Sequence, residues 1–279
     1  MAGNFTGHLE QAGEAGDFVN VKTAEVGAPK GLFPFYVPFV DGSAPGHFIH
    51  QMPISADVIR LNSPDENHQI EPEMAILCDL AYAGEMLESI TPKWAMAHND
   101  CSIRREGAKK ISEKKNWGAD SKGTANQRIA IDSFTPGGVL DRYRLTCFLL
   151  RDGELHPYGV DSPVNGYSYF YQQLNDWLVE RINNQQDQGP LEDLAAWFAI
   201  AGYPKQALIS VGATRYTDFG ETHYLQPGDR SIVALYDGEQ YDSAALEPLL
   251  ISAAPVKQPG LSVLNQRVEV RRNAPDLRP

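Results

Sequence analysis

The sequence predicts an α+β fold in which strands predominate. Many short apolar runs are separated by Gly and Pro, which number 24 and 19 among 279 residues. Runs of this kind are typical of strands joined by turns. An apolar share of 42% beside a charged share of 22% is ordinary for a chain that buries a core. One domain over residues 1–279 is expected, since this length can bury a sizeable core.

The expected elements follow one another along the chain. Apolar runs bounded by turn residues predict short strands and loops at 31–40, 47–55 and 56–62. Strands are predicted at 74–84, at 90–105 where the strand runs into a loop, at 207–216, at 230–238 and near 270. The run RYRLTCFLLRDGELHPYGV (142–160) predicts two strands around an Asp-Gly turn. LEDLAAWFAIAGYP (191–204) predicts a helix that stops at Gly202 and Pro204.

Two segments are expected to lie outside this frame. Residues 105–128 contain a charged stretch that is interpreted as a helix or a flexible excursion, and a C-terminal tail is expected from about 254. The basic side chains in and beside the first segment alternate with acidic ones, which is typical of a solvated helix face. They could also draw anionic substrates: Arg104, Arg105, Lys109, Lys110, Lys114 and Lys115.

Charge and cysteine content limit the partners. A net charge of −12 and a pI near 5.0 disfavour nucleic acid, because phosphate binding needs a positive surface. No apolar run approaches the roughly 18 residues that span a bilayer, so no membrane partner and no leader are expected. Three cysteines without C-x-x-C spacing suit a reducing compartment, and a cytoplasmic protein is expected.

The strongest chemical signal is the stretch IEPEMA. Glu71 and Glu73 are two residues apart on an expected strand and therefore project from the same face. Two carboxylates aimed together are tolerated when solvated, when one is protonated, or when a cation such as Mg²⁺, Ca²⁺ or Mn²⁺ lies between them. The ordinary alternative is the solvated face of a strand. Pro72 cannot donate to a sheet, which favours an edge or a bulge.

A second signal, HNDCSIRR, follows an apolar strand. It places Asn99, Asp100, Ser102 and Arg104 where site residues often lie on loops. The alternative is an Asx turn that caps the next segment.

Taken in order, these stretches resemble a known family. E-x-E followed by N-D-x-S-x-R is similar to the fumarylacetoacetate hydrolase (FAH) family. GNFTGHLEQAG resembles the family's G-x-N-Y-x-x-H-x-x-E opening, FPFYVPF its P-x-x-F-x-K-P segment and IDSFTPGG its D-T-F-x-P-x-G-P. INNQQDQ resembles its V-N-G-E-x-x-Q, and ISVGAT…LQPGD its T-G-T-P…L-x-P-G-D. The resemblance spans most of the chain.

The resemblance implies a mixed β-roll and a catalytic domain that acts on small anionic oxo-acids by hydrolysis of a carbon–carbon bond, decarboxylation or tautomerisation. It implies a divalent cation, Mg²⁺ first and Mn²⁺ or Ca²⁺ next, held by Glu71, Glu73 and Asp100. It also implies a homodimer. The resemblance also implies His8 as general base, and Asn99, Ser102, Arg104 and Thr214 are expected to bind substrate. Glu10 or Glu14 is expected to supply the acid for His8, and Lys122 to act in the site, in place of family residues that this chain lacks.

Departures from the family pattern leave two alternatives open. Gln11 stands where the acid partner of the histidine is expected, and Val37 and Ile129 stand where the family has lysines. Lys122 is expected to replace one of them, and Thr214 is displaced within VGAT. One alternative is a binding protein that keeps the cation without turnover, and the other is a structural homodimer without a metal.

Overall fold

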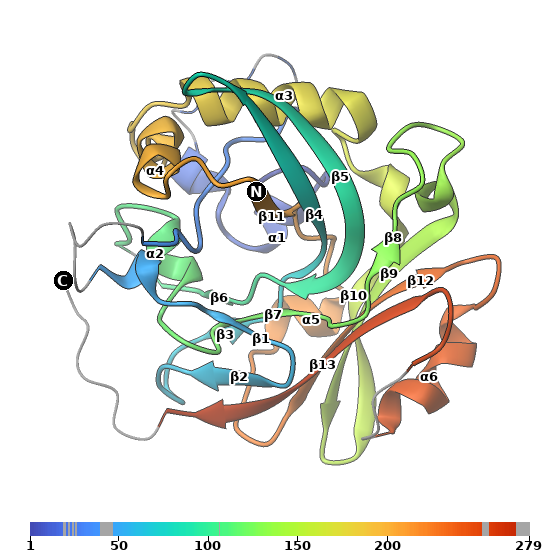
Figure 1. The fold of residues 1–279 in the computed structure, drawn as a ribbon. Helices are drawn as coiled ribbons and strands as arrows, with labels where there is room; N and C mark the ends of the chain where they lie inside the picture. The colour runs from blue at the N-terminus through green and yellow to red at the C-terminus, as the bar shows by residue number, and fades with distance from the viewer. Residues whose placement is uncertain are drawn as a thin grey trace.

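The computed structural model describes residues 1–18, 21, 23, 25, 27–39, 47–105, 107–252 and 257–271. Two larger sheets form its frame (Figure 1). The first has the order β1-β7-β5-β4-β11, with β8 also paired to β5: β1 (Ile54–Ser55), β7 (Lys122–Thr124), β5 (Met86–Asn99), β4 (Pro72–Ala83), β11 (Gln206–Ser210) and β8 (Ile129–Ala130). The second has the order β10-β9-β12-β13-β2: β10 (Glu154–Pro163), β9 (Tyr143–Arg151), β12 (Arg230–Asp237), β13 (Leu261–Val270) and β2 (Val58–Leu61).

The predicted mainly β fold of the mixed type is confirmed. Most strand pairs are antiparallel, whereas β1 with β7 and β13 with β2 are parallel. A small third sheet pairs β3 (His68–Gln69) with β6 (Ser102–Ile103).

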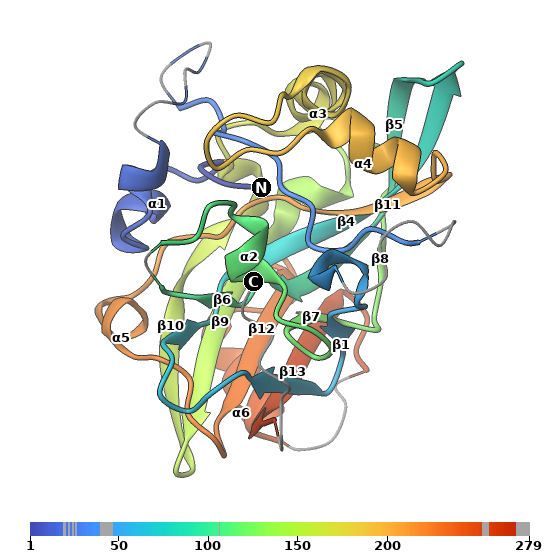
Figure 2. The ribbon, with the colours of Figure 1, turned by 90° about the vertical axis from the view of Figure 1, so that its left-hand side faces the viewer.

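Six helices accompany these sheets in the described residues. They are α1 (His8–Gln11), α2 (Ser112–Lys115), α3 (Tyr171–Asn184), α4 (Leu194–Ile200), α5 (Asp218–Thr222) and α6 (Ser243–Ile251), with 3₁₀ turns at Ala15–Phe18, Phe48–His50, Val139–Arg142 and Val164–Gly166. In Figures 1 and 2, α3 and α4 lie at one end of the molecule and α6 at the opposite end. None of the helices in the described residues is long and apolar enough to cross a membrane.

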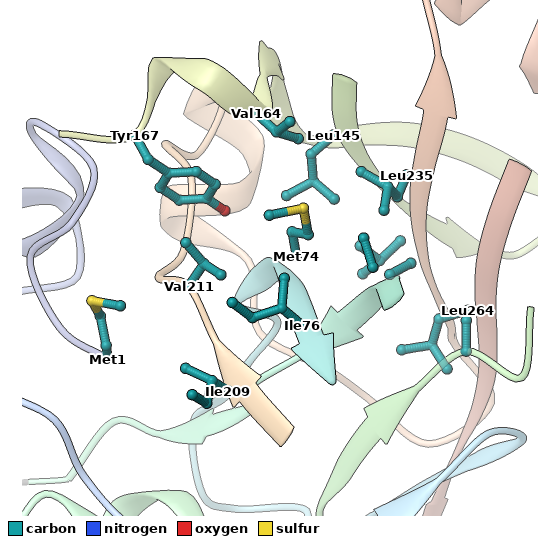
Figure 3. Close-up of a cluster of buried hydrophobic side chains, with 14 of the residues drawn as sticks. Met1, Met74, Ile76, Leu145, Val164, Tyr167, Ile209, Val211, Leu235 and Leu264 are labelled. Atoms are coloured by element: carbon teal, nitrogen blue, oxygen red, sulfur yellow. The ribbon is translucent and has the colours of Figure 1, made fainter. Parts of the chain in front are cut away.

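The main core lies where the inner faces of the two sheets meet. Figure 3 shows Met74 and Ile76 of β4 near Leu145, Leu235 and Leu264, which come from β9, β12 and β13. All five side chains are wholly buried. Burial of such apolar side chains is the main favourable term in folding, at about 25 cal/mol per Å² of apolar surface. The core therefore fixes β4, which carries one of the predicted metal ligands.

The predicted hairpin and helix are confirmed. Asp152 and Gly153 connect β9 and β10 with φ values of 52° and 84°, as a two-residue turn with two left-handed positions requires. The helix expected over 191–204 is α4, and the Asp193 side chain caps it by accepting a hydrogen bond from Ala196 N at 3.0 Å. Gly202 then takes a φ of 68°, which ends the helix.

Two of the stretches expected to hold short strands and loops are mostly loop. Within 31–39 the structure has only an isolated bridge from Gly31 to Ala2, because Pro34 and Pro38 lack the N–H that a ladder needs. Residues 48–50 form a 3₁₀ turn rather than a strand. Pro72 is the first residue of β4 and pairs with Asn99 of β5, whereas β11 pairs with β4 only from Ala75 onward. Pro72 therefore has a paired strand on one side only, and no bulge lies at this residue.

The two outlying segments also differ from expectation. The tail expected from about 254 instead contains β13, which pairs with β12 and β2, while 253–256 and 272–279 lie outside the described residues. The segment 105–128 contributes α2 and β7 to the packed interior. The interpretation of its basic residues as a solvated face is wrong for Lys114 and Lys115, which are 7% exposed. Their charges are retained inside because buried carboxylates face them.

Candidate metal centre

Three carboxylates converge at the start of β4. Pro72 of β4 pairs with Asn99 of β5, and the Asp100 N–H donates to the Glu71 carbonyl oxygen at 3.0 Å. This antiparallel register brings Asp100, just after β5, beside Glu71 and Glu73 at the beginning of β4. One oxygen from each of the three groups lies within 4.8 Å of the others. The sequence therefore identified three residues that the fold does bring together.

Cationic side chains surround two of these carboxylates. Lys115 Nζ lies 2.6 Å from Glu71 Oε2 and 2.9 Å from Asp100 Oδ2. Lys122 Nζ pairs with Asp100 Oδ1, and Arg104 Nη2 lies 2.9 Å from Glu71 Oε1 without hydrogen-bond geometry. These close ion pairs balance charges that would otherwise be costly to bury.

The pKa values of the two glutamates move in opposite directions. Burial by itself would raise the pKa of Glu71, but Lys115 and Arg104 outweigh it and lower that pKa to about 2. Burial raises the pKa of Glu73 to about 7, and the nearby Asp100 and Glu71 act in the same direction. For Asp100, burial raises the pKa, but Lys115 and Lys122 bring it well below its usual range. Glu71 and Asp100 are therefore ionised at pH 7, and Glu73 is poised between its two forms.

The three residues fit a hard divalent cation. Their ligand atoms are all carboxylate oxygens, which Mg²⁺, Mn²⁺ and Ca²⁺ prefer. Glu73 Oε2 accepts from Gly212 N at 2.8 Å, whereas Glu73 Oε1 is buried and has no hydrogen-bond partner among the described residues. Buried polar atoms normally have a partner, and a bound cation would supply one for Glu73 Oε1.

His8 lies beside the triad in a form that can accept a proton. Its Nδ1 is 2.9 Å from the Thr214 carbonyl oxygen, so Nδ1 carries the hydrogen and Nε2 the lone pair. Burial lowers the pKa of His8 to about 4, with smaller opposing effects from Glu71 and Glu14, and the ring is neutral at pH 7. His8, Glu71, Asp100 and Lys115 line one small cavity of about 20 Å³.

The acid near His8 is Glu14 and not Glu10. Glu10 is exposed, and its carboxylate makes no hydrogen bond or ion pair with His8 among the described residues. Glu14 is buried and accepts from Arg104 Nη1 at 2.7 Å. Gln11 has a structural task, since its amide exchanges two hydrogen bonds with the backbone of Tyr216, at 3.2 and 2.9 Å. Gln11 thus anchors the helix that carries His8.

The Lys122 ammonium lies in the centre beside Asp100. This position was expected because Val37 and Ile129 stand where the family has lysines. Lys122 is wholly buried on β7, and Val37 and Ile129 are buried apolar residues. Besides its pair with Asp100, Lys122 Nζ lies 5.5 Å from the centroid of the Phe35 ring. Burial lowers the pKa of Lys122, and Asp100 opposes this effect.

The residues expected to bind substrate mainly hold the loops in place. Asn99 Oδ1 accepts from Glu71 N at 3.2 Å, and Ser102 Oγ donates to the Asp100 carbonyl at 3.0 Å. Thr214 N donates to the Pro72 carbonyl at 3.1 Å. Arg104 donates hydrogen bonds to Gln69, Glu14 and Tyr216 and forms an ion pair with Glu71. Their contact with a substrate stays a prediction.

Sequence reasoning missed Lys115 and Tyr216 as members of the centre. Lys115 belongs to a run of charges whose composition is that of a surface helix. Tyr216 belongs to no recognisable motif. Its hydroxyl lies 3.0 Å from Arg104 Nη2, and the centroid of its ring lies 5.1 Å from that of the His8 ring. No signal in the sequence indicates that these side chains turn inward.

Fold and site define a mainly β α+β protein with a buried acidic triad suited to a hard cation. A family model described as "Family of unknown function (DUF5718)" matches residues 14–268, and the chain belongs to this family. A search of the curated proteins finds no match.

Some solved structures are distantly similar. They are Cg1458 with inhibitor (16% identity, 78% of this chain and 63% of that chain, TM-score 0.45) and yeast ynq8, a fumarylacetoacetate hydrolase family protein (13%, 86% and 84%, 0.47). A third is maleylpyruvate hydrolase from Sphingobium sp. SYK-6 with manganese(II) and pyruvate (11%, 78% and 61%, 0.41). The chain thus spans less than two thirds of the length of the first and third. One of these three, yeast ynq8, is described as a fumarylacetoacetate hydrolase family protein.

Proposed function

We propose that this protein is a divalent-cation-dependent enzyme that acts on a small oxo-acid. The favoured reaction is hydrolysis of a carbon–carbon bond, and decarboxylation and tautomerisation are the alternatives. The observation that carries the proposal is the convergence of Glu71, Glu73 and Asp100 within 4.8 Å beside a buried, neutral His8. An acidic triad next to a histidine that holds a free lone pair is suited to metal-assisted proton transfer.

The residues of the centre have separable tasks in this proposal. Glu71, Glu73 and Asp100 would hold the cation, with Mg²⁺ favoured over Mn²⁺ and Ca²⁺, and the bound cation would stabilise enolate-like charge on the substrate. His8 Nε2 would take a proton from water, while the Thr214 carbonyl keeps the ring in the required tautomer. Lys115 and Lys122 would favour an anionic substrate over a neutral one.

A second function is favoured by one observation. Lys115, Lys122 and Arg104 already neutralise Glu71 and Asp100. A protein with this internal charge balance could bind an oxo-acid anion without turnover. Metal-dependent turnover distinguishes the two functions.

The test is a screen of acylpyruvates, β-diketo acids and 2-oxo-acids with Mg²⁺ or Mn²⁺, repeated after EDTA treatment. We expect turnover of at least one compound, lost with EDTA and restored by the metal. His8→Ala should lower kcat by about 100-fold or more with Mn²⁺ affinity unchanged. The control is His156→Ala, a histidine of β10 that stacks on Phe219 and should leave the rate unaltered. Metal binding without turnover of any compound would favour the second function.

A further inference from the structure

Lys115 occupies the gap between two of the predicted metal ligands. Its Nζ lies 2.6 Å from Glu71 Oε2 and 2.9 Å from Asp100 Oδ2, and its side chain is 9% exposed. A divalent cation that bridged the same two oxygens would lie about 2.0–2.6 Å from each. An ammonium and a divalent cation cannot share that gap, because both need the same oxygens and the two charges repel.

The backbone around Lys115 is held on both sides. Before it, Ser112 Oγ donates to Glu192 Oε1 at 2.9 Å. After it, Asn116 Nδ2 donates to the carbonyl oxygens of Phe35 at 2.8 Å and Gln51 at 3.0 Å, and Asn116 Oδ1 accepts from Gly118 N at 2.8 Å. The position of Lys115 at the end of α2 is therefore fixed, and only its flexible side chain can leave the gap.

We propose that Lys115 is a tethered cation that competes with the divalent ion for Glu71 and Asp100, so that the ion and an oxo-acid anion bind together. This inference rests on the proposed function, because it concerns the loading of the same centre. In the resting protein the ammonium bridges the two carboxylates. Glu71 and Asp100 would hold the ion through these oxygens only after the Lys115 ammonium has left them, and the ammonium would then need another anionic partner.

The position of Lys115 indicates that partner. It lines the cavity of about 20 Å³ that His8, Glu71 and Asp100 also line, which has room for little more than a water molecule. A carboxylate could therefore enter only after the Lys115 side chain has left the gap, and it would then lie within reach of the displaced ammonium. A substrate carboxylate would replace the ion pairs that Lys115 gives up. Because coupling between two ligands is reciprocal, the oxo-acid should strengthen binding of the ion, and the ion binding of the oxo-acid.

The experiment is calorimetric titration of the full chain with MnCl₂ at fixed pH, with and without pyruvate, the simplest 2-oxo-acid. Lys115→Met should bind Mn²⁺ at least about tenfold more tightly than the wild type, since no internal cation has to be displaced. Pyruvate should strengthen Mn²⁺ binding to the wild type by about fivefold or more and have less effect on Lys115→Met. Lys109→Met removes an exposed charge from the same segment and should behave as the wild type.

Each outcome decides between the claims. If the wild type and Lys115→Met bind Mn²⁺ equally tightly, Lys115 does not compete with the ion, and the proposed metal-dependent function is unaffected. Mn²⁺ binding to neither protein would overturn both. If circular dichroism shows that Lys115→Met is unfolded, Lys115→Gln replaces it. Mn²⁺ should then raise the melting temperature of Lys115→Gln more than that of the wild type, and an equal rise would contradict the inference.

Discussion

At the scale of single residues, the two glutamates of the E-x-E motif have different electrostatic surroundings. Glu71 has Lys115 and Arg104 beside it and is ionised, whereas Glu73 accepts a backbone hydrogen bond from Gly212 N and lies near the carboxylates of Asp100 and Glu71. Burial raises the pKa of Glu73 to about 7, although the α-amino group of Met1 acts in the opposite direction. Near pH 7, Glu73 is therefore close to the midpoint between its protonated and ionised forms.

Glu73→Gln should accordingly change how stability depends on pH in EDTA. The pKa of Glu73 rises from 4.5 to about 7 on folding, so between these values the folded state binds a proton that the unfolded state lacks. Stability of the wild type therefore falls as the pH rises through this window. Glu73→Gln has no such proton to lose. As the pH rises from 5 to 8, its free energy of unfolding should therefore increase relative to that of the wild type by on the order of 1 kcal/mol or more.

Thermal melting at a series of pH values measures this difference. Comparison of the two proteins isolates Glu73, because the buried His8 and His98 are present in both. Glu88→Gln, a change of an exposed glutamate on β5, should leave the pH dependence as it is. If the melting temperatures of Glu73→Gln and the wild type change with pH in the same way, Glu73 is ionised in the folded protein already at pH 5.

Residue types and order were enough to predict the triad, but not its cationic partners. Glu71, Glu73 and Asp100 are recognisable because their motifs keep a fixed order. Lys115 is indistinguishable in sequence from Lys109, yet one is buried and the other exposed. What separates them is the anchoring of Ser112 and Asn116 by residues distant in the chain. Contacts of that range leave no local pattern.

At the scale of elements, turn and helix-stop signals predicted structure well. The Asp-Gly turn and the helix stop at Gly202 depend only on neighbouring residues. The α3 helix was not predicted, although Leu174, Leu178 and Ile182 recur every four residues and all are buried. For the run 31–40 the sequence left strand and loop both open, because apolar composition does not show whether a hydrogen-bonding neighbour exists.

The hairpin offers a test of the turn. Gly153 has a φ of 84°, and a Cβ added there would meet no atom within 4 Å, so only backbone strain opposes a side chain. Gly153→Ala should lower the free energy of unfolding by about 1 kcal/mol. Gly166→Ala is the control, since Gly166 has no positive φ and its Cβ would make an ordinary contact of 3.6 Å. Chemical denaturation measures both, and equal effects would contradict the assignment of the turn.

At the scale of the whole molecule, two sheets packed through one core place the start of β4 beside the end of β5. The centre is built from that junction, from α1 near the beginning of the chain and from α2 and β7 in the middle. The sequence indicated the mainly β class, but pairings such as β13 with β2 join residues too far apart for any local pattern to reveal. The homodimer stays a prediction.

The central claim is that Glu71, Glu73 and Asp100 form a cation site from which Lys115 must withdraw. A crystal structure of the protein grown with Mn²⁺ and pyruvate, measured with anomalous diffraction, tests it most directly. We expect an anomalous peak bounded by the three carboxylates at about 2.0–2.6 Å from their oxygens, with the Lys115 ammonium turned toward the pyruvate carboxylate. The absence of a peak, with Lys115 still bridging Glu71 and Asp100, would contradict the account.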